Sequence, residues 1–192
     1  MPRVGLSPDA VVDAVLELLD SSGTEPTLAA VAAHTGVAAP SLYKHVRNLA
    51  ELRRLVGLRV LEEVTDRLTS AVLGLSGDPA VAALMQAWRN YARQHPHRYS
   101  AMPLQPLTDP FFAPAAPRLM TAILAVLRDY GLTDEAAVHA ARRLRAAAHG
   151  FAVLEIQGGF GLSEDVEVSY RQLIDMVTAS LRPPSPRESQ LP

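Results

Sequence analysis

Residues 27–46 combine residue types that suit contact with nucleic acid. They read TLAAVAAHTGVAAPSLYKHV, in which two short apolar-faced segments flank Gly36. Twenty residues with a glycine turn in the middle have the length of a helix-turn-helix. The second helix, expected over about residues 39–45, begins with small residues that allow close approach to base edges. It ends with Tyr43 and Lys44, which can reach phosphates, as can Arg47 beyond it. The spacing therefore predicts a DNA-contacting unit.

Local charge agrees with this interpretation. Residues 34–59 contain five basic residues, Lys44, Arg47, Arg53, Arg54 and Arg59, and one acidic residue, Glu51, in a chain whose formal net charge is −2. The window is therefore locally basic by +4. A solvated helix face is the alternative explanation of the charge alone, and it is the helix-turn-helix spacing that favours DNA.

Other chemistries lack a matching constellation. The chain has no cysteine, which excludes disulfides, thiolate catalysis and Cys-ligated metals. Its six histidines form no H-E-x-x-H pair, and no glycine-rich phosphate loop or nucleophile elbow is present. We expect no metal, no cofactor and no enzymatic activity.

The sequence predicts that the segments around residues 27–46, which must position them, are helices. Alternating strand patterns are absent, and Ala, Leu, Arg and Glu dominate the periodic stretches, so the predicted fold class is all-α. Ser7 is expected to cap a first helix that ends at Gly23, and Thr27 a second, short helix to about His34, which Gly36 breaks. A capping-box-like pair, Asn48 and Glu51, opens a long helix to about residue 75. Further helices are expected over about 78–95, 117–131, 133–157 and 163–181, the last capped by Ser163.

The composition and the absence of targeting signals indicate the class of protein and its cellular compartment. Hydrophobic residues make up 48% and charged residues 20% of 192 residues, which is ordinary for a globular chain. The first ten residues lack the apolar core of a signal peptide, and no apolar run approaches the ~20 residues of a membrane span. We expect a cytoplasmic protein with no membrane partner.

The residues from Gly36 to Val46, followed by Asn48 and Leu52, resemble the TetR family of bacterial transcriptional regulators, whose usual pattern is A-G-V-S-x-x-x-L-Y-x-H-F. The resemblance implies an N-terminal three-helix bundle with the helix-turn-helix (residues 1–48) and a larger helical domain (49–182) that binds an effector and dimerises. Residues 49–75 would form the connecting helix, and 183–192 a disordered tail. Two positions depart from the pattern: Ala38 replaces the usual Ser and Val46 the usual Phe.

The resemblance also assigns candidate contacts. Carried over to matching positions, the phosphate contacts are Thr27, Tyr43, Lys44 and His45, and the base-edge contacts are Ala39, Pro40 and Ser41. Further along, Trp88, Tyr91, His149 and Gly150 are similar to the C-terminal domain of the TetR subgroup named for a Trp-His-Gly motif.

Two further sets of residues are candidates in the second domain. Apolar and aromatic residues around a proline-rich stretch, with one histidine, suggest an effector pocket, the alternative being ordinary core. The pocket candidates are Met85, Trp88, Met102, Phe111, Met120, Leu124 and His149. Apolar stripes with small residues on the last two helices suggest a dimer interface, the alternative being packing within one chain. The interface candidates are Ala148, Phe151, Ala152, Glu155, Tyr170, Leu173 and Val177.

The sequence thus predicts a ligand-responsive regulator, a repressor that binds a pseudo-palindromic double-stranded DNA operator as a homodimer and is released by a small apolar effector. The alternative is a helical ligand-binding or protein-interaction module whose helix-turn-helix is vestigial. A helical enzyme, the third hypothesis, has no supporting constellation.

Overall fold

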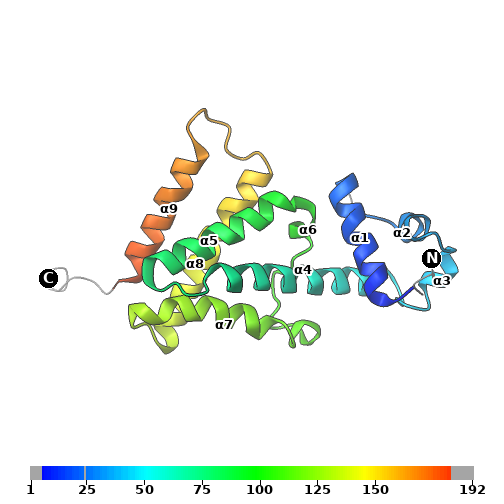
Figure 1. Cartoon of the computed structure of the whole chain (residues 1–192), viewed down its shortest axis with the longest axis horizontal. Coiled ribbons are helices and arrows are strands. Elements are labelled where there is room, and N and C mark those ends of the chain that lie inside the picture. The colour runs from blue at the N-terminus through cyan, green and yellow to red at the C-terminus, as the bar shows by residue number, and fades with distance from the viewer. Residues whose placement is uncertain (1–5, 24, 183–192) are drawn as a thin grey trace, which may run out of the picture. The chain divides into compact units, whose positions relative to one another are not determined.

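The computed structural model describes residues 6–23 and 25–182, and within these ranges it is helical and contains no strand (Figure 1). The tail predicted for residues 183–192 lies outside the described residues. The α-helices are α1 (Pro8–Ser22), α2 (Leu28–Thr35), α3 (Ala39–Leu42), α4 (Leu49–Ala71), α5 (Gly77–Gln94), α6 (Pro96–Ser100), α7 (Ala116–Leu127), α8 (Asp134–Ile156) and α9 (Val166–Leu181). Two short 3-10 helices, η1 (Pro110–Phe112) and η2 (Arg128–Tyr130), lie beside α7 in the chain. The predicted all-α class is confirmed.

Local capping explains where the first helix begins and ends. The Ser7 hydroxyl accepts a hydrogen bond of 3.1 Å from the Ala10 N–H, and Pro8 occupies the first turn, where its missing N–H costs nothing. Gly23 ends α1 in the left-handed conformation, at φ 69°, and its N–H donates to the Leu19 carbonyl at 3.2 Å. Both predicted boundaries are confirmed.

Three expected boundaries differ. The third helix ends at Leu42 instead of His45, because the chain continues in tighter turns in which Lys44 N–H donates to the Ser41 carbonyl and His45 N–H to that of Leu42. The long helix ends at Ala71, four residues before the expected end, and gives way to turns around Gly74. The last helix is capped by the Asp165 carboxylate, which accepts from the Glu167 N–H at 2.8 Å, and not by Ser163.

The chain divides into two compact units. Unit 1 comprises residues 1–63 and 95–117, and unit 2 comprises residues 64–94 and 118–192, as far as each is described. The segment 95–117 and the first part of α4 thus pack with the N-terminal helices, although the resemblance assigns them to the second domain. The functional domain boundaries at 48 and 182 remain a prediction.

Within unit 1, α6 is joined to α1 by charge. The Arg98 guanidinium donates to both carboxylate oxygens of Asp20, at 2.9 and 2.6 Å, and also to Glu63 on α4, at 3.3 and 3.4 Å. Arg98 is only 18% exposed, so this pairing is partly shielded from solvent. It holds the short helix against the three-helix region that carries the candidate DNA contacts.

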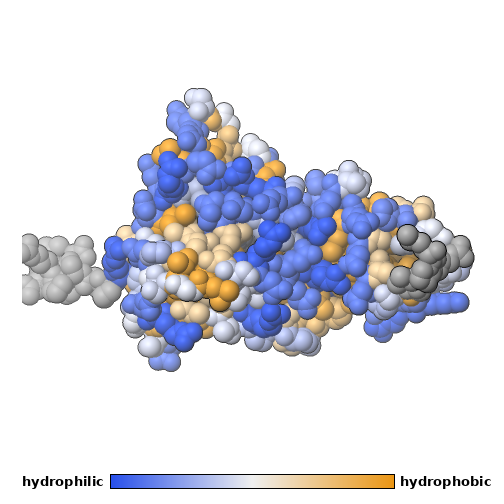
Figure 2. Space-filling view, viewed as in Figure 1, coloured by the Kyte–Doolittle hydropathy of each residue, from blue (hydrophilic) through white to orange (hydrophobic). Residues whose placement is uncertain are grey.

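Within unit 2, α5 packs against α8 and α9. The inner face of α5 carries fully buried large side chains, including Leu84, Met85, Trp88 and Tyr91. Apolar side chains are also exposed in this unit, and Figure 2 shows several on the surface around the loop that joins α8 and α9. The exposed ones on these two helices and their loop are Val138, Leu154, Phe160, Leu162, Val168 and Met176.

Candidate functional site

The helix-turn-helix predicted from the sequence is present in unit 1. The Thr27 hydroxyl caps α2 by accepting from the Ala30 N–H at 3.2 Å. Gly36 adopts φ 68°, a left-handed conformation that glycine reaches without steric cost, and so turns the chain between α2 and α3. Leu42, the last residue of α3, and Val46, four residues further on, are buried, at 0% and 1% exposure. The buried pair fixes which face of α3 points outward.

The outward face carries most of the predicted contact residues. Tyr43 is 56% exposed, an unusual position for so large an apolar ring, and Lys44 is exposed beside it. Thr27, Ala39, Pro40 and Arg47 are exposed as well, while Ser41 and His45 are half-buried. Seven of the eight predicted contact residues therefore lie at positions 39–47, with the small ones first and the tyrosine and lysine after them, and the eighth, Thr27, caps α2.

The beginning of α3 lacks a side-chain cap. Ala38 occupies the N-cap position with extended backbone (φ −71°, ψ 140°), but no side chain accepts a hydrogen bond from the first turn. A serine at this position would supply an acceptor. The departure from the family pattern at this position thus has a structural consequence: no side chain caps α3, Pro40 has no N–H, and the Ser41 N–H donates to the Ala38 backbone carbonyl at 2.8 Å.

The basic window is less positive than its sequence suggests. Arg53 pairs with Glu25, Arg54 with Asp109, and Arg59 with both Asp9 and Asp13. Arg47 donates from Nε and Nη2 to Glu51 Oε1 at 3.0 and 2.9 Å. The expected local charge of +4 is wrong as a measure of the surface, because four of the five cations have carboxylate partners and most of those carboxylates lie outside the window.

Lys44 is the exception. Among residues 6–23 and 25–182, no ion-pair partner of Lys44 is described, and its side chain is exposed. A cation without a carboxylate partner keeps its full charge for a phosphate. The charge available on the outward face of α3 and the turns that follow it is therefore concentrated at Lys44.

The predicted pocket residues are divided between the two units. Met102 and Phe111 belong to unit 1, and Met85, Trp88, Met120, Leu124 and His149 belong to unit 2. Met85 and Trp88 are fully buried, whereas Met120, Leu124 and His149 are half-buried. Burial, and secondarily the nearby charge of Arg145, lowers the pKa of His149, which favours the neutral ring.

The predicted interface residues mostly pack within their own chain. Ala148, Ala152 and Tyr170 are 0% exposed and Val177 is 4% exposed. The Phe151 ring lies 4.6 Å from that of Phe160 and 4.7 Å from that of Tyr170, between ring centroids. These buried residues pack between helices of the same chain. A partner subunit would instead contact the exposed side chains of α8 and α9.

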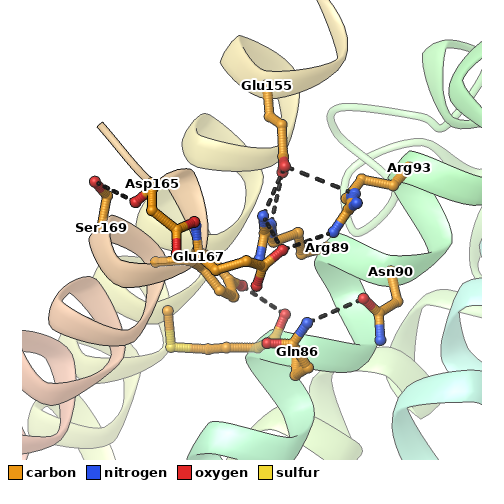
Figure 3. Close-up of polar contacts among 10 residues, drawn as sticks. Gln86, Arg89, Asn90, Arg93, Glu155, Asp165, Glu167 and Ser169 are labelled. Carbon is orange, nitrogen blue, oxygen red and sulfur yellow. Dashed lines mark hydrogen bonds and ion pairs between the residues drawn. The ribbon is translucent and has the colours of Figure 1, made fainter. Parts of the chain in front are cut away.

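An arginine that the sequence analysis did not single out lies between α5, α8 and α9 in unit 2 (Figure 3). Arg89, on α5, has a side chain only 1% exposed and donates to both carboxylate oxygens of Glu155, each at 2.6 Å. It also donates to Glu167 at 2.7 and 2.9 Å, and its guanidinium lies 4.6 Å from the centroid of the Tyr170 ring. This cluster ties α5 to α8 and α9. Its only sequence signal is a charged residue on the otherwise apolar face of α5.

In the described ranges no group of three or more His, Asp or Glu side chains is arranged to hold a metal ion. Over the same residues, none of the helices combines the length and apolar character needed to cross a bilayer.

Comparison with known proteins identifies the family. A family model for the tetracyclin repressor-like C-terminal domain matches residues 81–177. The chain is 39% identical over 156 residues to the uncharacterized HTH-type transcriptional regulator Rv0681 of Mycobacterium tuberculosis, covering 80% of this chain and 72% of the relative. It is 32% identical over 167 residues to the uncharacterized HTH-type transcriptional regulator YobS of Bacillus subtilis, covering 86% and 87%.

A solved structure agrees at the level of fold. The crystal structure of a possible TetR family transcriptional regulator from Streptomyces coelicolor superimposes with a TM-score of 0.70 at 17% sequence identity, over 91% of this chain and 98% of that one. The helix-turn-helix, the family model and the two relatives therefore agree. This chain belongs to the TetR family of transcriptional regulators.

Proposed function

We propose that the protein is a repressor that binds a pseudo-palindromic operator as a homodimer in the cytoplasm and is released from it by a small apolar effector. Two copies of α3 would enter successive major grooves, whose centres are about 34–36 Å apart. The protein acts by binding and carries out no catalysis. Its partners are double-stranded DNA, the effector and a second copy of the chain.

The observation that carries this proposal is the outward face of α3. Exposed Tyr43 and exposed Lys44 follow the small residues Ala39 and Pro40, over a buried Leu42. Thr27, Tyr43, Lys44, His45 and Arg47 contact phosphates in the proposal, and Ala39, Pro40 and Ser41 face the bases. Because these three residues offer few long donors, apolar contact with thymine methyl groups and DNA shape contribute most of the sequence preference.

The test uses the DNA upstream of the protein's own gene. Fluorescence anisotropy with this fragment at several salt concentrations should give a saturable affinity that falls linearly with log salt. Lys44→Ala removes one phosphate contact per subunit, so the salt slope should decrease by about 0.9 per subunit bound. Arg128→Ala, which removes an exposed cation of η2 in unit 2, is the matched control and should leave the slope unchanged. An unaltered slope for Lys44→Ala would exclude its phosphate contact.

Dimerisation is proposed through α8 and α9. Leu154 and Met176 are 49% and 61% exposed, respectively. Large apolar side chains exposed on neighbouring helices favour burial against a partner. Glu155 and the buried interface candidates would support this surface from within, through their contacts with α5.

The effector is proposed to bind in the second domain, among the pocket candidates. Bound ligand would favour one of two conformations, and it would lower DNA affinity only by binding that conformation more tightly. Trp88 is the chain's single tryptophan, so its fluorescence reports binding near it. An effector should change the Trp88 fluorescence and release the protein from DNA over the same concentration range. A compound that changes the fluorescence but does not release DNA is a ligand without effector function.

A second candidate function is favoured by one observation. The uncapped start of α3 at Ala38 weakens the helix that would enter the groove. The alternative is a helical ligand-binding module with a vestigial helix-turn-helix. Failure to bind any duplex DNA at low salt, together with a ligand-dependent change in Trp88 fluorescence, would select it.

A further inference from the structure

Unit 1 contains a cavity whose lining includes none of the effector-pocket candidates. It has a volume of about 290 Å³, and α1, α4 and the end of α6 contribute to its walls. Its apolar lining includes Val15 and Leu19 from α1 and Leu52 and Val56 from α4. The volume is close to the lower limit of small-molecule pockets, about 300 Å³. Since a dry cavity of about 150 Å³ holds benzene, a molecule with one ring fits.

Polar groups line the same cavity. Arg53 Nη2 donates to Glu25 Oε2 at 3.0 Å, and Arg53 Nε donates to the other oxygen of the same carboxylate. Arg53 and Glu25 both line the cavity, as do His97 and Ser100. The ion pair places donor N–H groups beside acceptor oxygens, and its two charges cancel. A neutral ligand group with an adjacent acceptor and donor matches this edge better than a carboxylate, which Glu25 would repel.

Gly23 shapes the wall of the cavity. A Cβ atom at Gly23 would lie 2.9 Å from His97 Nε2, closer than side-chain contacts allow, and Gly23 has φ 69°. The absence of a side chain therefore lets the His97 ring approach the end of α1. The ring lines the cavity at this point, where it offers a further hydrogen-bonding nitrogen.

We propose that this cavity is a binding site for a small neutral molecule that joins an apolar ring or short chain to an amide group. The apolar part lies against Leu19, Leu52 and Val56. The amide carbonyl accepts from Arg53, and its N–H donates to Glu25. Such a ligand contacts α1, α4 and α6 together and so stabilises unit 1 whether or not DNA is bound. The inference is independent of the proposed function.

The test is a titration of the full chain with benzamide, followed through the methyl resonances of Val, Leu and Ala. Shifts should be saturable and concentrated at Leu19, Leu52 and Val56, with a dissociation constant of about 1–10 mM, as expected for so few atoms. At ten times this constant, the unfolding midpoint of unit 1 should rise by about 6–11 °C. Shifts spread over both units, or no saturation, would overturn the proposal.

Matched variants and probes sharpen the result. Ser100→Trp places a large ring at the exposed end of α6 that lines the cavity, and it should weaken benzamide at least tenfold. Ser70→Trp, on an exposed position of α4 in unit 2, should not. Benzoate and ethylbenzene should bind more weakly than benzamide, and Glu25→Gln or Arg53→Met should reduce the preference. Equal binding of the three probes would overturn the assigned ligand chemistry. If Ser100→Trp does not fold, the positions of the shifted methyl resonances in the wild type still show whether benzamide binds in this cavity.

Discussion

Arg89 and Glu155, which are 66 residues apart in the chain, form a doubly hydrogen-bonded ion pair in which both bonds are 2.6 Å long. The arginine side chain is 1% exposed and the glutamate side chain 17% exposed. Removing one partner of such a pair leaves a buried charge without its main partner, which costs more than the intact pair contributes to stability. The pair is therefore a sensitive point of unit 2.

Glu155→Ala should lower the free energy of unfolding of unit 2 by about 3 kcal/mol, since breaking a buried pair costs about 3–5 kcal/mol and Glu167 still partners Arg89. Urea unfolding followed through Trp88 fluorescence measures the change. Glu164→Ala, in the exposed loop before α9, is the control and should change stability by less than about 0.5 kcal/mol. A loss below about 1 kcal/mol for Glu155→Ala would show that the pair is dispensable.

Glu167 makes the stability of unit 2 sensitive to acid. Hydrogen bonding from Arg89 is the largest cause that lowers the pKa of Glu167 below its ordinary value of 4.5, opposed by partial burial and assisted by Arg93. A carboxylate whose pKa is lower in the folded state stabilises the fold above its unfolded pKa, and this contribution is lost as the pH falls through the folded pKa.

The difference in unfolding free energy between the wild type and Glu167→Gln should thus be constant from pH 7 to about pH 5 and should shrink below about pH 4.5. Unfolding at a series of pH values, with Trp88 fluorescence as the readout, measures it. Glu164→Gln, the same substitution at an exposed glutamate in the loop before α9, is the matched control. A constant difference for Glu167→Gln down to pH 3 would contradict the role of its ionised form.

Ala38→Ser should restore the missing cap of α3. The serine hydroxyl can accept from an N–H of the first turn, as Ser7 and Thr27 do in α1 and α2, and such caps contribute about 1 kcal/mol. We expect higher thermal stability of unit 1 and tighter binding to duplex DNA. Ala38→Val has no acceptor and is the control. A serine variant no more stable than the valine variant would indicate that α3 requires no cap.

Met176→Arg should separate the proposed dimer. The side chain is 61% exposed in the single chain, so the substitution leaves the core intact while placing a charge in an apolar contact. Sedimentation velocity should show the monomer at concentrations where the wild type is a dimer, and DNA affinity should fall at least tenfold because two half-sites no longer act together. Leu73→Arg, at a site 73% exposed in the turns that follow α4, is the control and should remain dimeric.

Much of unit 1 could be predicted from the sequence because its signals are local. The caps at Ser7 and Thr27 and the turn at Gly36 depend on residues within four positions of one another, and all three were predicted and are present. The exposure of Tyr43 followed from the helical period, which placed Leu42 and Val46 on the opposite face. The end of α3 was misjudged because the chain passes gradually from helix into tighter turns.

The tertiary structure alone decided which charges are paired and which apolar residues are covered. The sequence does not show that Arg53, Arg54 and Arg59 are paired, because the carboxylates that accept their hydrogen bonds lie 28 to 55 residues away along the chain. The partners of Arg89 lie 66 and 78 residues away, and the cavity beside Leu52 is lined by three separate segments. Capping and periodicity act over a few residues and can be read along the chain, whereas ion pairing and cavity formation depend on packing between distant segments.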